Sequence, residues 1–146
     1  MKTKMVYNDK KTPISIRAAL FALLEEYTCK KSSAPKKAQS TILPLLFGYL
    51  EEHFREELTL SDVAMALGYS ESYISHSLSK ICGMNFSSLV SGIRIEEAKR
   101  LLVTTSLPIS SVALESGFGT ERSFHRAFSK LVGMTPSRYK EGKETK

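Results

Sequence analysis

Apolar side chains recur at helical spacing along most of the chain beyond residue 40. In the segment 42–55 they fall on one face of a helix, at Ile42, Leu45, Leu46, Tyr49, Leu50 and Phe54. Similar stripes predict helices over 61–67, 71–81, 86–103, 109–116 and 121–132. Thr135 followed by Pro136 predicts a short last helix, because proline suits a first helical turn. No segment alternates apolar and polar residues for long enough to predict a strand, so the pattern predicts an all-α fold.

The first 40 residues differ from the rest. Residues 1–13 are polar and rich in lysine, and residues 29–40 combine serine, proline and four lysines, which is typical of a linker. Between them, an apolar stripe predicts a helix over 14–27. This helix either packs on the rest of the chain or joins two copies as a homodimer, and both interpretations remain open. We therefore expect an N-terminal extension over 1–40 and a folded domain over 41–142.

A duplication within the folded domain is the most informative feature of the sequence. With an offset of 49, Leu60, Val63, Ala64, Gly68 and Tyr69 recur as Ile109, Val112, Ala113, Gly117 and Phe118. After the additional Gly119 the offset is 50, and Ser70, Glu71, Ile74, Leu78, Lys80, Gly83 and Met84 recur as Thr120, Glu121, Phe124, Phe128, Lys130, Gly133 and Met134. Chance does not easily keep such a register, so the sequence contains an internal repeat.

Each copy has the pattern of a helix-turn-helix unit. Gly68 or Gly117 supplies the left-handed conformation that ends the first helix. The aromatic residue that follows, Tyr69 or Phe118, is expected to fill the corner before a capped second helix. The sequence therefore predicts two helix-turn-helix subdomains joined by a long linker helix: a first unit over about 60–81, the linker helix over about 86–103 and a second unit over about 109–132.

The outward faces of the two second helices carry the candidate functional residues. In the first unit these are Ser72, Tyr73, Ser75, His76 and Ser79. In the second unit they are Glu121, Arg122, Ser123, His125, Arg126 and Ser129, with Phe124, Phe128 and Leu131 expected in the core. Such side chains bond to base edges and phosphates, and arginine can bind guanine with two hydrogen bonds. Arg126 is the strongest candidate because it is cationic and central on its helix.

The distribution of charge distinguishes the two units. The chain has a formal net charge of +6, and residues 1–40 hold nine basic and three acidic side chains. Residues 41–79 contain Arg55 as their only basic residue against six acidic ones, whereas residues 80–146 contain eleven basic and six acidic residues. Basic side chains that neutralise phosphates make DNA binding salt-dependent. We therefore expect the second unit to supply more of the salt-dependent binding.

The predicted linker helix sets a distance. Eighteen residues rise about 27 Å in a helix, and successive major-groove faces on one side of B-DNA lie ~34 Å apart. With its flanking turns, a rigid helix of this length can hold two second helices about one DNA turn apart. One monomer would then read two adjacent major-groove segments. Where the spacing of the grooves does not match that of the helices, the DNA would have to bend, at a cost of order 1–6 kcal/mol.

Enzyme chemistry and membrane insertion find little support. The three histidines, His53, His76 and His125, are far apart and form no metal-binding pair, and no nucleophile or nucleotide-loop motif is present. Cys29 and Cys82 form neither a disulfide framework nor a zinc motif. No cofactor or metal is expected. The longest apolar run has seven residues, far below the roughly 20 that span a bilayer, and no secretion signal is evident, so we expect a cytoplasmic protein with no membrane partner.

The residues from about 42 to 140 resemble the DNA-binding domain of the AraC/XylS family of bacterial transcription regulators. The matching blocks are Thr59-Leu60-Ser61-Asp62-Val63-Ala64, Gly68-Tyr69-Ser70-x-Ser72-Tyr73-Ile74-Ser75, Arg94-Ile95-x-x-Ala98-x-x-Leu101-Leu102, Gly117-Phe118, Arg122-Ser123-Phe124-x-Arg126-Ala127-Phe128-x-Lys130 and Gly133-Met134-Thr135-Pro136-Ser137-x-Tyr139. The resemblance implies two helix-turn-helix units on a long helix, binding to double-stranded promoter DNA at asymmetric sites, and activation of transcription through RNA polymerase.

The sequence departs from the family pattern in the first unit. The family commonly carries arginine at the position of His76, an aromatic residue at Leu78 and a basic residue at Ser79. This departure agrees with the weaker DNA contact expected from the charges. Larger members also carry a sensing and dimerising domain in front, whose closing helix the segment 14–27 resembles, so the chain is either a fragment or a small stand-alone regulator. The alternative function is a helix-turn-helix scaffold that binds another protein rather than DNA.

Overall fold

The computed structural model describes residues 42–144, and within this range it contains seven helices and no strand. The helices are α2 (Ile42–His53), α3 (Leu60–Leu67), α4 (Glu71–Cys82), α5 (Phe86–Thr104), α6 (Ile109–Glu115), α7 (Glu121–Val132) and α8 (Pro136–Glu144). The all-α fold with two helix-turn-helix units on a long helix is confirmed. The helix predicted over 14–27 and the linker over 29–40 lie outside the described residues.

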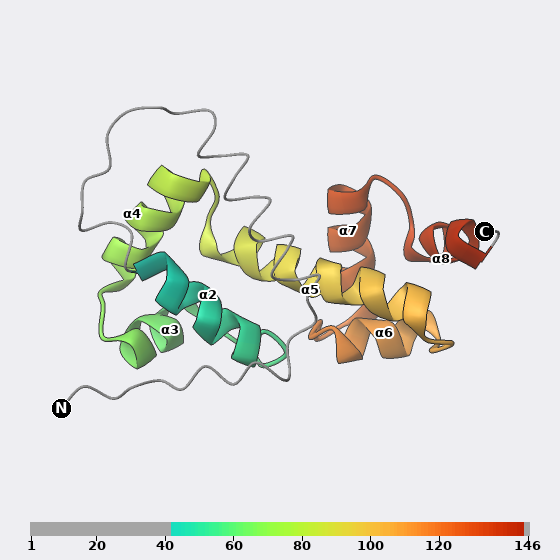
Figure 1. The fold of residues 1–146 in the computed structure, drawn as a ribbon, viewed down its shortest axis with the longest axis horizontal. Coiled ribbons are helices and arrows are strands. Elements are labelled where there is room, and N and C mark those ends of the chain that lie inside the picture. The colour runs from blue at the N-terminus through green and yellow to red at the C-terminus, as the bar shows by residue number, and fades with distance from the viewer. Residues whose placement is uncertain (1–41, 145–146) are drawn as a thin grey trace.

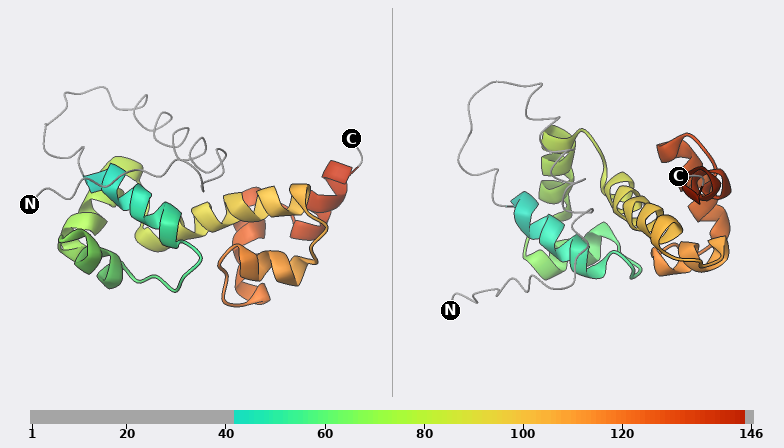
Figure 2. Two further views of the ribbon diagram at one scale, coloured as in Figure 1. Left: turned by 60° about the horizontal axis from the view of Figure 1, so that its bottom comes forward. Right: turned by 45° about the vertical axis from the view of Figure 1, so that its right-hand side comes forward.

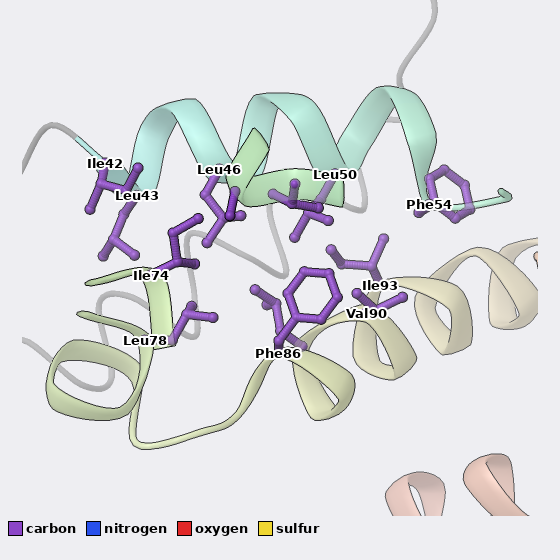
Figure 3. Packing of buried hydrophobic residues seen from close by; sticks show 13 residues of the cluster. Ile42, Leu43, Leu46, Leu50, Phe54, Ile74, Leu78, Phe86, Val90 and Ile93 are labelled. Atoms are coloured by element: carbon purple, nitrogen blue, oxygen red, sulfur yellow. The ribbon is translucent and has the colours of Figure 1, made fainter. Parts of the chain in front are cut away.

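The long helix α5 connects two groups of helices (Figure 1). The helices α2, α3 and α4 gather near its first half, and α6, α7 and α8 gather near its second half. Each group has its own hydrophobic core. In the first core, Leu46 and Leu50 of α2 face Ile74 and Leu78 of α4 and the first turns of α5 (Figure 3).

The second core is built around aromatic rings. Phe124 and Phe128 of α7 are fully buried and pack edge to face with ring centroids 5.5 Å apart. Phe118 and Tyr139 pack on either side of this pair, with centroid distances of 5.4 and 5.5 Å. Aromatic pairs of this kind stabilise a core beyond the area they bury. The cluster therefore holds α7 firmly on α5, α6 and α8.

Helix α5 serves both cores with different faces. Phe86, Leu89, Val90 and Ile93 belong to the first core, whereas Ile95, Ala98, Leu101 and Leu102 belong to the second. At about 100° per residue, the mean directions of these two apolar stripes differ by roughly 140° around the helix axis. The two groups of helices consequently lie on different sides of α5, which the two views of Figure 2 show.

Side-chain caps fix where the helices begin. Thr59 and Asp62 form a reciprocal capping box at the start of α3, and hydrogen bonds from the Thr59 side chain and backbone hold the pKa of Asp62 below its ordinary value. Ser70, Asn85 and Thr120 each accept the backbone N–H three residues further on, at the starts of α4, α5 and α7. The boundaries of these helices are therefore encoded locally.

Three expectations about burial are wrong. Tyr69 does not fill its corner as Phe118 does: it is 36% exposed, against 6% for Phe118, and its ring stacks on the exposed Tyr73. Leu131 is 52% exposed, and Val132 of the same last turn of α7 packs against the second core instead. On α2, Leu45 is exposed and Leu43 is buried in its place as a member of the first core.

Candidate nucleic-acid interface

Helices α4 and α7 occupy equivalent positions as the second helices of the two units. Each has 12 residues, begins at a hydroxyl cap, Ser70 or Thr120, and ends at a left-handed glycine, Gly83 or Gly133. Apolar residues anchor one face of each helix in a core. The opposite faces carry the candidate residues, of which ten are exposed and His125 is half-buried.

The exposed face of α4 is polar but almost uncharged. Ser72, Ser75, His76 and Ser79 are exposed along it. The Tyr73 ring is stacked on Tyr69, with ring centroids 5.3 Å apart and planes 15° from parallel. This face offers hydroxyl and imidazole groups that donate or accept hydrogen bonds, and a flat aromatic pair, but little positive charge.

The exposed face of α7 is cationic. The side chains of Arg122 and Arg126 are exposed and make no hydrogen bond or ion pair with any other residue in the described part of the chain. His125 Nε2 lies 3.4 Å from Glu121 Oε1, and its ring packs edge-on against Phe124. The imidazole is thus partly held, whereas both guanidinium groups can turn toward a ligand. An arginine of this kind can form two parallel hydrogen bonds to a phosphate or a guanine.

Ser123 differs from the other candidates because its side chain is already engaged. Its hydroxyl donates to the backbone oxygen of Thr120 over 2.8 Å and accepts from the Thr120 hydroxyl over 3.0 Å. Its backbone N–H also donates to the Thr120 hydroxyl. Ser123 therefore contributes to the start of α7, and its hydroxyl oxygen can still accept one hydrogen bond from a ligand, although its proton is already donated to Thr120.

Sequence reasoning left out Lys130, which lies one helical turn after Arg126 on α7 and is exposed. Its position four residues from Arg126 was the signal that could have found it, because residues at this spacing share a helix face. Arg138 in the first turn of α8 is a second exposed cation outside the predicted set. The basic surface of the second unit is therefore larger than the sequence reasoning proposed.

Other kinds of site find no support in the described part of the chain. Residues 42–144 contain no group of three or more histidine, cysteine or acidic side chains that could hold a metal ion. Burial raises the pKa of the free, half-buried Cys82 thiol, which disfavours the reactive thiolate. None of the helices in this range is both long and apolar enough to span a membrane.

Comparison with known proteins identifies the fold. A family model described as a helix-turn-helix domain matches residues 63–142. An uncharacterised HTH-type transcriptional regulator of Staphylococcus aureus is 37% identical over 92 residues, which cover 63% of this chain but only 12% of that protein. The chain therefore spans a small part of the length of this relative.

Solved structures give the same result. The C-terminal domain of AraT, a response regulator from Geobacillus stearothermophilus, is 34% identical with a TM-score of 0.67, over 75% of this chain and 89% of that one. The DNA-binding domain of AdpA, solved in complex with a target DNA, has a TM-score of 0.66 over 70% of this chain and 93% of that one. At 20% identity, this second likeness establishes the fold alone. By its family match, the chain belongs to the AraC/XylS family of helix-turn-helix DNA-binding transcription regulators.

Proposed function

We propose that this chain binds double-stranded promoter DNA and regulates transcription from it, with α4 and α7 each entering a major groove of one duplex. The observation that carries the proposal is the pair of exposed arginines on α7, Arg122 and Arg126, which have no partner among the described residues. They lie on a helix whose opposite face is anchored by Phe124 and Phe128. A rigid helix with a polar outward face is the usual reader of base edges.

The length of α5 supports reading by both helices. Its 19 residues rise about 28 Å, which approaches the ~34 Å between successive major-groove faces of B-DNA. The duplex would close the remaining difference by a bend that costs of order 1–6 kcal/mol.

The two helices would divide the work. Ser72, Tyr73, Ser75, His76 and Ser79 on α4 offer hydrogen bonds and apolar contacts to bases. On α7, Arg122, Arg126 and Ser129 offer bidentate or single bonds to guanine and phosphate, and the Glu121–His125 pair accepts or donates beside them. Binding through α7 would therefore respond more strongly to salt than binding through α4.

Selection of bound duplexes from a random library tests the proposal, because it requires no known target promoter. We expect the enriched duplexes to share two short blocks centred about 10 base pairs apart, one DNA turn. Arg126→Ala should relax the sequence of one block, and His76→Ala that of the other. Lys99→Ala is the control, because it removes one positive charge from α5, where Lys99 pairs with Glu96, away from both faces. Enrichment of a single block would refute reading by two helices, and no enrichment would refute specific DNA binding.

We further propose three properties that follow the family resemblance. The bound protein activates transcription by contacting RNA polymerase, the segment 14–27 joins two chains as a homodimer, and the protein acts in the cytoplasm. Transcription in vitro from a selected site tests the first property, and repression there would refute it. Sedimentation of the full chain tests the second, which a monomer at micromolar concentration would refute.

A further inference from the structure

The turn after α2 meets α5 at a polar junction. Arg94 of α5 donates from Nε to the backbone oxygen of Phe54 and from Nη2 to that of Glu56, both over 2.7 Å. These carbonyl groups follow the last turn of α2 and would otherwise lack a helical partner. The end of α2, which shares the first core with α3 and α4 and is therefore counted with the first unit, is thereby tied to the middle of the linker helix.

Arg55 extends from the same turn to the second unit. Its Nε donates over 2.9 Å to the backbone oxygen of Glu115, the last residue of α6. Its Nη2 donates over 2.6 Å to Oε1 of Glu97, a fully buried carboxylate on α5. Arg100 completes the partners of Glu97 with a bond of 2.8 Å to each carboxylate oxygen. A buried carboxylate bound by two arginines fixes the direction of each guanidinium group.

Gly117 brings the backbones of the two units into direct contact. It follows α6 with φ of +92°, and a Cβ atom at this position would lie 2.8 Å from both the Arg55 Cα and the Phe54 oxygen. The equivalent glycine of the first unit, Gly68, also has a positive φ, of +74°, but would meet nothing within 4 Å. The close approach is therefore specific to the second unit, where the turn touches the end of α2.

The two hydrophobic cores do not connect the first unit to the second. Within the described residues they are separate clusters that share only the helix α5, on faces that point in different directions. A shared helix alone leaves each unit free to tilt and twist about its own packing. The contacts of Arg55, Arg94, Glu97 and Gly117 supply the remaining constraint, and we call these four residues the junction.

We propose that the junction positions the two units at one separation and one angle, so that α4 and α7 match only DNA sites with one spacing between their two blocks. Arg55 is a positioning residue in this scheme, because it lies in the turn after α2 and acts through Glu97 and Glu115. The selection of DNA sites with one spacing rests on the proposed function. The fixed separation and angle of the two units do not.

The distance between nitroxide labels tests the junction without DNA. The labels would be placed by Ser75→Cys and Ser129→Cys, both exposed positions, in a full chain carrying Cys29→Ser and Cys82→Ala. We expect one narrow distance distribution for this parent and a width about twofold larger for Arg55→Met, which removes the bond to Glu115 of the second unit and the bond to Glu97 of α5. Arg100→Met is the matched control, since Arg100 binds the same carboxylate from within α5, and it should keep the parental width.

An unchanged width in Arg55→Met would overturn the proposal, as would equal broadening in Arg100→Met. If Arg55→Met does not fold by circular dichroism, Arg55→Lys replaces it, because lysine keeps the charge but cannot form the two directed bonds of the guanidinium group. This variant should also broaden the distribution, and a parental width would again overturn the proposal.

A series of selected duplexes with one or two base pairs inserted between the blocks tests the consequence for DNA. We expect the unlabelled chain with its own Ser75 and Ser129 to lose about tenfold in affinity per inserted pair, and Arg55→Met in that chain to lose about threefold or less. Arg100→Met should follow the unlabelled chain. If Arg55→Met instead weakens binding by one factor at every spacing, the junction only stabilises the fold and the proposal fails. If no duplex is bound, the proposed function fails, and the label distances still decide the role of the junction.

Discussion

The two glycines that end the first helices of the units form a matched pair for measuring the contact between the units. Gly68 and Gly117 have φ of +74° and +92°, so an alanine at either position is strained in the left-handed region. This strain costs about 1–2 kcal/mol. Alanine also reduces the conformational entropy of the unfolded chain, which stabilises the fold by a few tenths to 1 kcal/mol and offsets part of the strain. Gly68→Ala should therefore lower the free energy of unfolding by about 1 kcal/mol.

Gly117→Ala carries an additional cost. Its Cβ would lie 2.8 Å from the Arg55 Cα and the Phe54 oxygen, which are backbone atoms that cannot rotate away. Restoring an ordinary contact moves this turn by about half an ångström, and such overpacking costs typically 1–3 kcal/mol. The same movement weakens the bonds that Arg94 makes to Phe54 and Arg55 makes to Glu115. We therefore expect Gly117→Ala to lose about 3 kcal/mol or more.

Urea unfolding of the parent and the two variants, followed by helical circular dichroism, measures both free energies by linear extrapolation. A difference of about 2 kcal/mol between the variants corresponds to a clear separation of midpoints at the slopes of small domains, about 1–3 kcal/mol per molar. Equal losses in Gly68→Ala and Gly117→Ala would refute the reasoning, because the measured cost would then be conformational strain alone. A larger loss in Gly68→Ala would refute it as well.

Three further predictions concern binding, acid stability and packing. Arg126→Ala should reduce the slope of log binding constant against log salt concentration by about 0.9, the value for one lost phosphate contact. His76→Ala should leave that slope nearly unchanged. Anisotropy titrations at several salt concentrations measure both slopes, and a larger reduction for His76→Ala would contradict the charge argument. Burial raises the pKa of Glu97, but bonds and charges of Arg100 and Arg55 outweigh it and hold that pKa below its ordinary value. The stability from this group is therefore present above about pH 4.3, the ordinary glutamate pKa, and is lost as pH falls through the lower folded value. Glu97→Gln should cost about 1.5–3 kcal/mol at neutral pH and progressively less in acid, and a cost independent of pH in urea titrations would contradict this. Phe128→Ala should cost about 3–5 kcal/mol and Leu131→Ala less than about 0.5 kcal/mol, and thermal melts with similar losses for both would show that Leu131 is buried in solution.

Features encoded by neighbouring residues could be predicted from the sequence. The left-handed Gly68 and Gly117 depend on backbone and side chains within a few positions of one another. Helical periodicity likewise predicted the buried face of α7 at Phe124 and Phe128. These features agree with the structure because local physics decides them.

Features decided by distant segments could not be predicted in the same way. Leu131 satisfies the helical period of α7, but the packing of the neighbouring helices covers Val132 in that last turn and leaves Leu131 52% exposed. Glu97 would ordinarily be expected on the surface, yet it is buried by contacts with Arg55, 42 residues away, and with Arg100. Arg55 was visible as the single basic residue of an acidic stretch. Its partners were not, because they depend on how the two units meet.

The number of residues between the two apolar stripes of α5 determines how the two units are oriented relative to each other. Adding one residue near Arg94 would rotate the second half of α5 by about 100° and shift it by about 1.5 Å relative to the first half. The second unit, which packs on the second stripe, would rotate about the helix axis by the same angle relative to the first unit. The length of the three-residue loop between α4 and α5 does not set an orientation in this way, because the first core already holds both helices in place. An insertion between the two stripes of α5 should therefore change the orientation of one unit relative to the other, whereas an insertion in the loop between α4 and α5 should not.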